Sequence, residues 1–165
     1  MIDIIIDKII EGLKKDLMSG SDLYSDHLVD NITNKGLTEK SPNMSIAIIE
    51  DEAVPLSFDI SSQIAQTSEQ YRILIQFLVR SASEEEGKEE RRIVTRRIKH
   101  SFLRRNGNIF EPLLTAKDED TGYNEKPRKY EIERTRFDND VINGQYLYMS
   151  ETSILVQTEV NYYNN

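Results

Sequence analysis

The residues best suited to chemistry in this chain are few and far apart. The 165 residues include two histidines, His27 and His100, and no cysteine. Neither histidine has a carboxylate or a second histidine at a spacing that metal sites use, which favours solvated or packed side chains. Asp118, Glu119 and Asp120 are adjacent but lack the spaced ligands and following glutamate of a calcium loop, which favours a solvated loop. We therefore expect no metal site and no cofactor.

Catalytic arrangements are not indicated elsewhere in the sequence. Glu131 and Glu133 share one face of an alternating strand, which is typical of an exposed sheet surface and not of a glycosidase pair. The chain has no phosphate-binding glycine loop and no serine in a nucleophile elbow. A small nuclease would need clustered carboxylates with a lysine on neighbouring strands, and no such set is evident. We expect the protein not to be an enzyme.

The composition is that of one domain with little apolar material. Hydrophobic residues make up 38% and charged residues 30% of the 19.2 kDa chain, which suggests long polar segments or burial shared with neighbouring copies. A net charge of −8 argues against a nucleic-acid binder that depends on phosphate contacts. No signal peptide and no apolar run of membrane-spanning length is present, so we expect a soluble protein that is cytoplasmic where it is made.

The elements that organise the chain are a strand and the helix that follows it, at residues 70–105. Alternating apolar positions predict a strand with one buried face. They are Tyr71, Ile73, Ile75, Phe77 and Val79. In the helix, Val94, Ile98 and Phe102 fall four residues apart and predict a stripe that packs on the sheet. Ser83 followed by Glu86 has the spacing of a capping box at the start of this helix.

The remaining segments predict a single α+β domain. An amphipathic helix is expected at residues 3–17, and polar loops at about 19–43, with room for one short helix, and at 117–129. Further strands are expected at residues 44–50, 57–66, 108–116, 130–135 and 152–163, with a turn at 51–55. Asn143-Gly144 predicts a hairpin turn. The expected fold is one antiparallel or mixed sheet packed against two main helices.

The helix at residues 84–105 has an acidic first half and a basic second half. Its dipole favours this distribution on a solvated helix. The same pattern fits a head-to-tail contact, in which each half meets the opposite charge on a neighbouring copy of a closed ring. The candidate interface residues are Glu84, Glu85, Glu89, Glu90, Arg91, Arg92, Arg96 and Arg97, together with the aromatic residues Tyr162 and Tyr163 near the terminus. Reversal of the four arginines is expected to weaken such a ring and to leave the fold intact.

The order of these elements resembles that of bacteriophage tail terminator proteins. The resemblance is carried by an N-terminal amphipathic helix, a strand ending in YRILIQFLVRS, the charged helix EEERRIVTRRIKHSFLR and a late strand ending in SILVQTEVNYY. It implies a virion protein of the tail or neck, assembled in the host cytoplasm into a hexameric ring. That ring would cap the tail tube, end its polymerisation and join the tail to the head connector. The implied partners are the tail tube protein, neck proteins and the tail sheath.

DNA would pass through the lumen of such a terminator ring without specific binding, and an acidic wall favours this passage.

The sequence is also compatible with other functions. A neck or head-completion protein, as connector or stopper, would share the ring but bind the portal side. A small nuclease and a monomeric adaptor are less favoured alternatives. The two long polar loops do not distinguish among these functions.

Overall fold

The fold is α+β, as the sequence predicted, with one mixed six-stranded sheet and two helices. The computed structural model describes residues 2–60, 65–104, 116–117 and 124–161. The elements are α1 (Ile2–Leu17), β1 (Asn31–Thr33), β2 (Met44–Ile60), β3 (Ala65–Ser81), α2 (Glu84–Arg104), β4 (Ala116–Lys117), β5 (Asn124–Ile142) and β6 (Gln145–Asn161). In the order β1-β2-β3-β6-β5-β4, β1 is parallel to β2 and all other neighbours are antiparallel.

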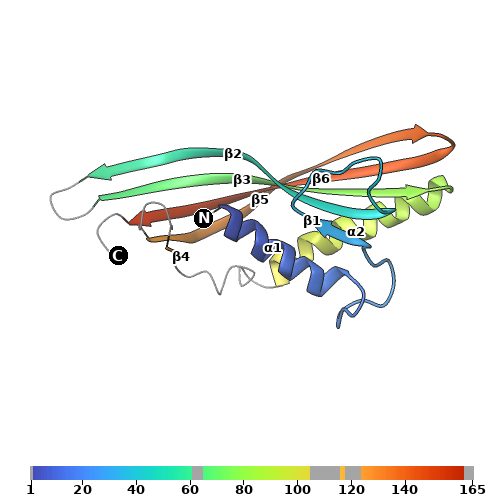
Figure 1. Cartoon of the computed structure of the whole chain (residues 1–165), viewed down its shortest axis with the longest axis horizontal. Helices are drawn as coiled ribbons and strands as arrows, with labels where there is room; N and C mark the ends of the chain where they lie inside the picture. Colours follow the sequence, from blue (N-terminus) through green and yellow to red (C-terminus); the bar gives the residue numbers. More distant parts are fainter. Residues whose placement is uncertain (1, 61–64, 105–115, 118–123, 162–165) are drawn as a thin grey trace.

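The strands are much longer than the helices that pack on them. Strands β2, β3 and β6 have 17 residues and β5 has 19, which corresponds to about 55–65 Å, whereas α1 and α2 have 16 and 21 residues and span about 24 and 32 Å. Figure 1 shows both helices below one part of the sheet, while the β2–β3 hairpin extends past them. It also shows the sheet turning over along its length, as expected of strongly twisted long strands. A large part of the sheet is therefore not covered by helices.

The core lies between the helices and one face of the sheet. The alternating apolar residues of β3, including Ile73, Ile75 and Phe77, are fully buried, which confirms the predicted period of two. In α1 the buried stripe includes Ile5, Ile9 and Leu13. In α2 the predicted stripe is confirmed, since Val94, Ile98 and Phe102 are each 0% exposed.

Buried polar side chains link α2 to the sheet and to α1. Thr95 of α2 and Ser150 of β6 share a buried hydrogen bond of 2.8 Å. The side chain of Asp16, at the end of α1, is also buried and accepts hydrogen bonds from Ser101 at 2.7 Å and from Arg104 at 2.9 Å. These hydrogen bonds therefore add polar contacts to the apolar packing of α2 on the sheet and join α2 to α1.

The second face of the sheet carries a polar network in place of helices. Arg72 contacts Glu52 at 2.7 Å and Glu133 at 3.1 Å, and its hydrogen bond to Glu133 raises the pKa of Arg72. Arg80 donates hydrogen bonds to the carbonyls of Thr38 and Ser41, so the segment before β2 is held near this face. No described helix is long and apolar enough to cross a membrane.

Several expected boundaries were wrong, each because pairing in the sheet outweighs a local signal. Residues 51–55 were expected to form a turn, but β2 runs through them with bulges, so one long strand replaces the two expected at 44–50 and 57–66. The last strand was expected to begin at residue 152, but β6 begins at Gln145 and pairs with β3 on one side and β5 on the other.

The two expected polar loops also contain strands. The segment at 19–43 holds β1 and no helix, and residues 124–129 of the expected loop at 117–129 are the beginning of β5. Residues 116–117 form β4, and most of the strand expected at 108–116 lies outside the described residues. The Asn143-Gly144 turn is confirmed, since both residues have positive φ, 51° and 76°.

Candidate assembly interface

The first turn of α2 is stabilised by contacts within the helix itself. Ser83 Oγ accepts the backbone N–H of Glu86 at 3.4 Å, which is one half of the predicted capping box, and the Ser83 carbonyl accepts the N–H of Gly87. Glu84 pairs with Lys88 at 3.0 Å, and this hydrogen bond raises the pKa of Lys88. The acidic beginning of the helix is thus accounted for by capping, the dipole and one exposed pair.

Gly87 lies close to β6, against the ring of Tyr148. A Cβ atom at Gly87 would lie 2.5 Å from a ring carbon of Tyr148, so no larger residue fits without movement. The Tyr148 ring is 3% exposed, stacks on Tyr146 at 6.4 Å and lies 5.1 Å from the Arg91 guanidinium. Nothing in the sequence indicated that this glycine has a packing role.

Arg91 joins α2 to the β5–β6 hairpin. Its guanidinium lies 5.0 Å from the Phe137 ring centroid and 5.1 Å from that of Tyr148, which are cation–π distances. It also donates hydrogen bonds to the carbonyl of Asp138 and to the side chain of Asn139. Desolvation by burial lowers the pKa of Arg91. This candidate interface residue is therefore occupied within its own chain.

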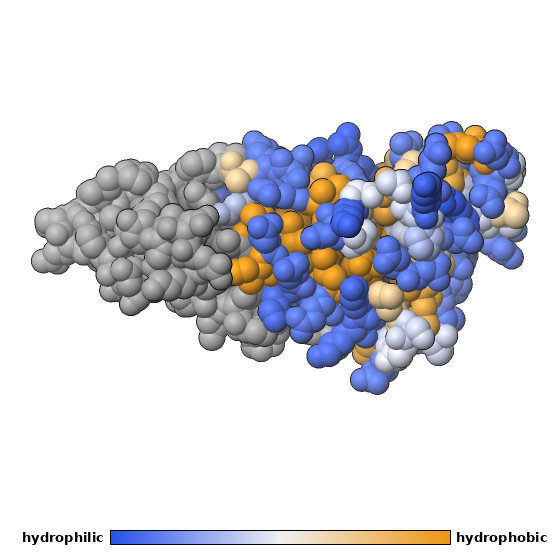
Figure 2. Space-filling model, viewed as in Figure 1, coloured by the Kyte–Doolittle hydropathy of each residue, from blue (hydrophilic) through white to orange (hydrophobic). Residues whose placement is uncertain are grey.

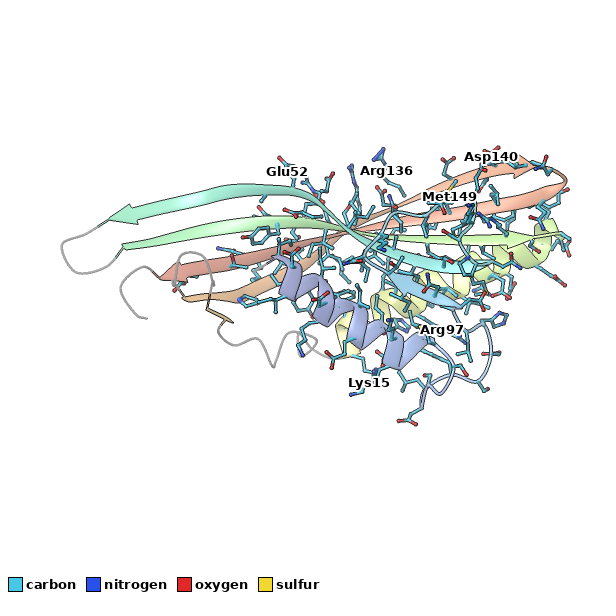
Figure 3. The ribbon with its side chains drawn as sticks, in the orientation of Figure 1. Lys15, Glu52, Arg97, Arg136, Asp140 and Met149 are labelled. Atoms are coloured by element: carbon cyan, nitrogen blue, oxygen red, sulfur yellow. The ribbon has the colours of Figure 1, made fainter. Side chains whose placement is uncertain are left out.

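Glu90 and Arg97 are also engaged within the chain, by the segment after α1. Glu90 lies 2.9 Å from His27 Nδ1, and Arg97 lies 2.9 Å from Asp26 Oδ1 and 3.9 Å above the Tyr24 ring. Figure 3 shows Arg97 on the side of the sheet where the helices lie, facing this segment. The hydrogen bond from Arg97 is the largest cause of the lowered pKa of Asp26. The segment after α1, which was expected to be a polar loop, thus packs on α2.

The remaining candidate residues are exposed on α2. Glu89 pairs with Arg92 at 2.9 Å, and both side chains are more than half exposed. Glu85 and Arg96 are exposed and have no ion pair among the residues that the structure describes. Residues 162–163 lie outside the described part of the chain. Of the eight charges, Glu85 and Arg96 are thus the two best placed to meet a neighbouring copy.

A basic groove of about 460 Å³ lies between α2 and β5. It is lined by five cationic side chains of α2, by Thr95 and by Phe137.

The exposed apolar side chains of β5 were not among the candidates from the sequence. Phe137, Val141 and Ile142 are 60%, 61% and 43% exposed, and Figure 2 shows apolar surface among polar atoms at the end of the molecule where the β5–β6 hairpin lies. The sequence signal for this exposed apolar surface was the pair Val141-Ile142 directly before Asn143-Gly144, since residues beside a hairpin turn are seldom buried.

The described residues offer no metal-binding cluster of three or more histidine, cysteine or carboxylate side chains. His27 contacts Glu90 and Asp26, His100 is exposed on α2, and residues 118–120 lie outside the described part.

No family model matches the chain, and no curated protein sequence matches it. The assignment of a function therefore depends on the geometry of the sheet and helices.

Proposed function

We propose that the protein is a structural virion protein, the tail terminator of a bacteriophage tail, which closes into a head-to-tail ring of about six copies. The observation that supports this proposal is the size of the sheet relative to its helices. Four strands of 17–19 residues are covered on part of one face, against a usual strand length of about 5–6 residues. A subunit with this much uncovered sheet and strand edge is suited to burial against neighbours.

In this role the ring binds the last ring of tail-tube subunits and stops their polymerisation. One face of the ring matches the interface of the tube and the other does not, so growth ends and the second face meets the head connector. The tail sheath is a further partner. The net charge of −8 supports passage of DNA through the lumen, because a negative wall repels phosphates.

The first test is the mass of the purified protein, alone and with tail-tube subunits, by light scattering and negative-stain imaging. We expect a hexamer, or a smaller species that forms a six-fold cap on tube ends and limits tube length. A protein that neither forms rings nor binds tubes would overturn the proposal. Binding to connector proteins but not to tubes would also overturn it, in favour of a neck protein.

The second test addresses the ring contact through charge reversal on α2. Glu85→Lys and Arg96→Glu should each weaken the ring, and the double reversal should restore part of it, because in a head-to-tail contact each residue meets the other type. Glu11→Lys, on the exposed face of α1, is the control. Arg91 and Arg97 are left unchanged, since their contacts within the chain mean that reversal would also perturb the fold. If the unchanged protein, the two single reversals and the double reversal all form equally stable rings, α2 is not part of the interface.

A further inference from the structure

The strand β5 has a long edge that no other described strand covers. It pairs with β6 along its whole length, but β4 contacts it only at Asn124 and Glu125. Bulges interrupt β5 between Pro127 and Lys129 and between Ile132 and Arg134. Residues 134–142 are free of bulges and prolines, so they form a regular nine-residue edge able to accept another strand.

Backbone groups on this edge are turned away from β6. The N–H groups of Asn139 and Val141 donate to the carboxylates of Asp138 and Asp140, at 2.9 and 2.8 Å. Because backbone groups of successive residues in a strand point to opposite sides, the odd-numbered residues of this stretch direct their N–H and C=O groups to the free edge. The two aspartates occupy this edge only through contacts with their immediate neighbours.

The side chains of the edge are charged in a self-complementary order. Arg134 and Arg136 precede Phe137, and Asp138 and Asp140 follow it at the same distances along the strand. All four charged side chains are exposed, and none makes an ion pair with another described residue. Figure 3 shows Arg136 and Asp140 along the side of β5 away from the helices. An antiparallel copy of this stretch therefore presents the opposite charge at each charged position.

We propose that the free edge of β5 is a two-fold docking surface for a second copy of this chain, with the two β5 strands antiparallel and centred on Phe137. Arg136 then faces Asp138 of the second copy, and Arg134 faces Asp140 of the second copy, each pair twice. Phe137 faces its own counterpart and hides apolar surface that is 60% exposed in the single chain. About six backbone hydrogen bonds join the two edges, and the aspartates exchange contacts with their neighbours for cross-strand ion pairs.

The other long edge of the sheet lacks these properties. Residues 48–60 of β2 are also without a second described partner, but bulges interrupt them between Glu50 and Glu52 and between Pro55 and Ser57. Their charges at 50–52 are all acidic, so two copies would place like charges together. The β5 contact also leaves room for the helices. Since α2 packs on β3 and β6, the two α2 helices would lie roughly 19 Å apart, beyond the screening length of about 8 Å at physiological salt.

The charge order gives a direct test by sedimentation of the whole chain over a range of concentrations. The unchanged protein should form a dimer that weakens with salt. Arg136→Asp and Asp138→Arg should each raise the dimer dissociation constant by about tenfold or more, because each change places like charges opposite one another twice. The double exchange, Arg136→Asp with Asp138→Arg, should restore dimerisation. Glu131→Lys, beyond the bulge on the same strand, should have no effect.

The register is tested by cross-linking, since the chain contains no cysteine. Phe137→Cys places a thiol opposite itself, at a Cα separation of about 5.5 Å that a disulfide can span. Val141→Cys is the matched control, with almost the same exposure, 61%, but a different opposite residue. We expect rapid oxidation to a disulfide dimer for the first variant only. Equal cross-linking of the two variants, a monomer at all concentrations, or a dimer indifferent to the single charge reversals would overturn the proposal.

This two-fold contact stands independently of the ring. A head-to-tail ring uses two different surfaces, whereas the β5 contact uses one surface twice. Loss of the dimer in Asp138→Arg with intact ring formation would separate the two contacts. If no ring forms, the disulfide dimer of Phe137→Cys is still expected.

Discussion

Replacement of Gly87 by alanine measures how closely α2 is packed against β6. Inside an exposed helix this change stabilises the protein by about 1 kcal/mol, because alanine loses less backbone entropy on folding. At Gly87 the new Cβ would lie 2.5 and 2.7 Å from two ring carbons of Tyr148 and 3.4 Å from the Cβ of Ser81. The first two distances are too short for real carbon contacts, so either the ring or the helix must shift.

Neither shift is easy in this structure. The Tyr148 ring is 3% exposed and is held between Tyr146 and Arg91, and the facing residues Thr95 and Ser150 share a buried hydrogen bond. Overpacking of this kind costs about 1–3 kcal/mol. After subtraction of the helix-propensity gain of about 1 kcal/mol, we expect Gly87→Ala to lower the free energy of unfolding by up to about 2 kcal/mol.

The assay is urea unfolding followed by circular dichroism. Gly36→Ala is the control, since nothing lies within 4 Å of a Cβ at Gly36 and its φ is not positive, and it should have little effect. In a Tyr148→Ala background the ring is gone, so the same change at Gly87 should become neutral or stabilising. Stabilisation by Gly87→Ala in the unchanged protein would refute the close packing of α2 on β6.

Two other predictions concern carboxylates that join distant segments. Asp16→Ala should lower the free energy of unfolding by about 1–3 kcal/mol, because the carboxylate is 3% exposed and accepts hydrogen bonds from Ser101 and Arg104. An unchanged urea midpoint would contradict this role. The lowered pKa of Asp26 in the folded state, caused chiefly by Arg97, means that its stabilising contribution is complete above the unfolded pKa of about 4 and lost as the pH falls through the folded pKa. Asp26→Asn should therefore melt at a lower temperature than the unchanged protein at pH 7, with a smaller difference in melting temperature at pH 2. A gap that is the same at both pH values would exclude this linkage.

Local signals in the sequence predicted local structure well. The period of two along β3, the four-residue spacing in α2, Ser83 at the helix start and Asn143-Gly144 at the hairpin all act within a few residues. Signals failed where a paired strand overrides them. Pro55 and the acidic residues before it predicted a turn, yet β2 continues through them because β3 supplies its backbone partners and bulges absorb the misfit.

The candidate interface was predictable only as a set of charges. The sequence placed acidic and basic residues on one helix, but it could not show that Glu90 meets His27, 63 positions earlier, and that Arg97 meets Asp26, 71 positions earlier. The role of Gly87 and the exposure of Phe137 were equally invisible, because both depend on which strand lies beneath or beside them.

The sequence by itself determined the fold class, the two helices and the buried face of the central strand, because periodicity and capping depend on neighbours along the chain. It also determined the arginine–aspartate symmetry about Phe137, which is a property of order alone. Only the tertiary structure decided which charges are satisfied and which remain available. It also placed the self-complementary stretch on an uncovered edge of the sheet, because ion pairs and strand edges are set by distances between residues far apart in the chain.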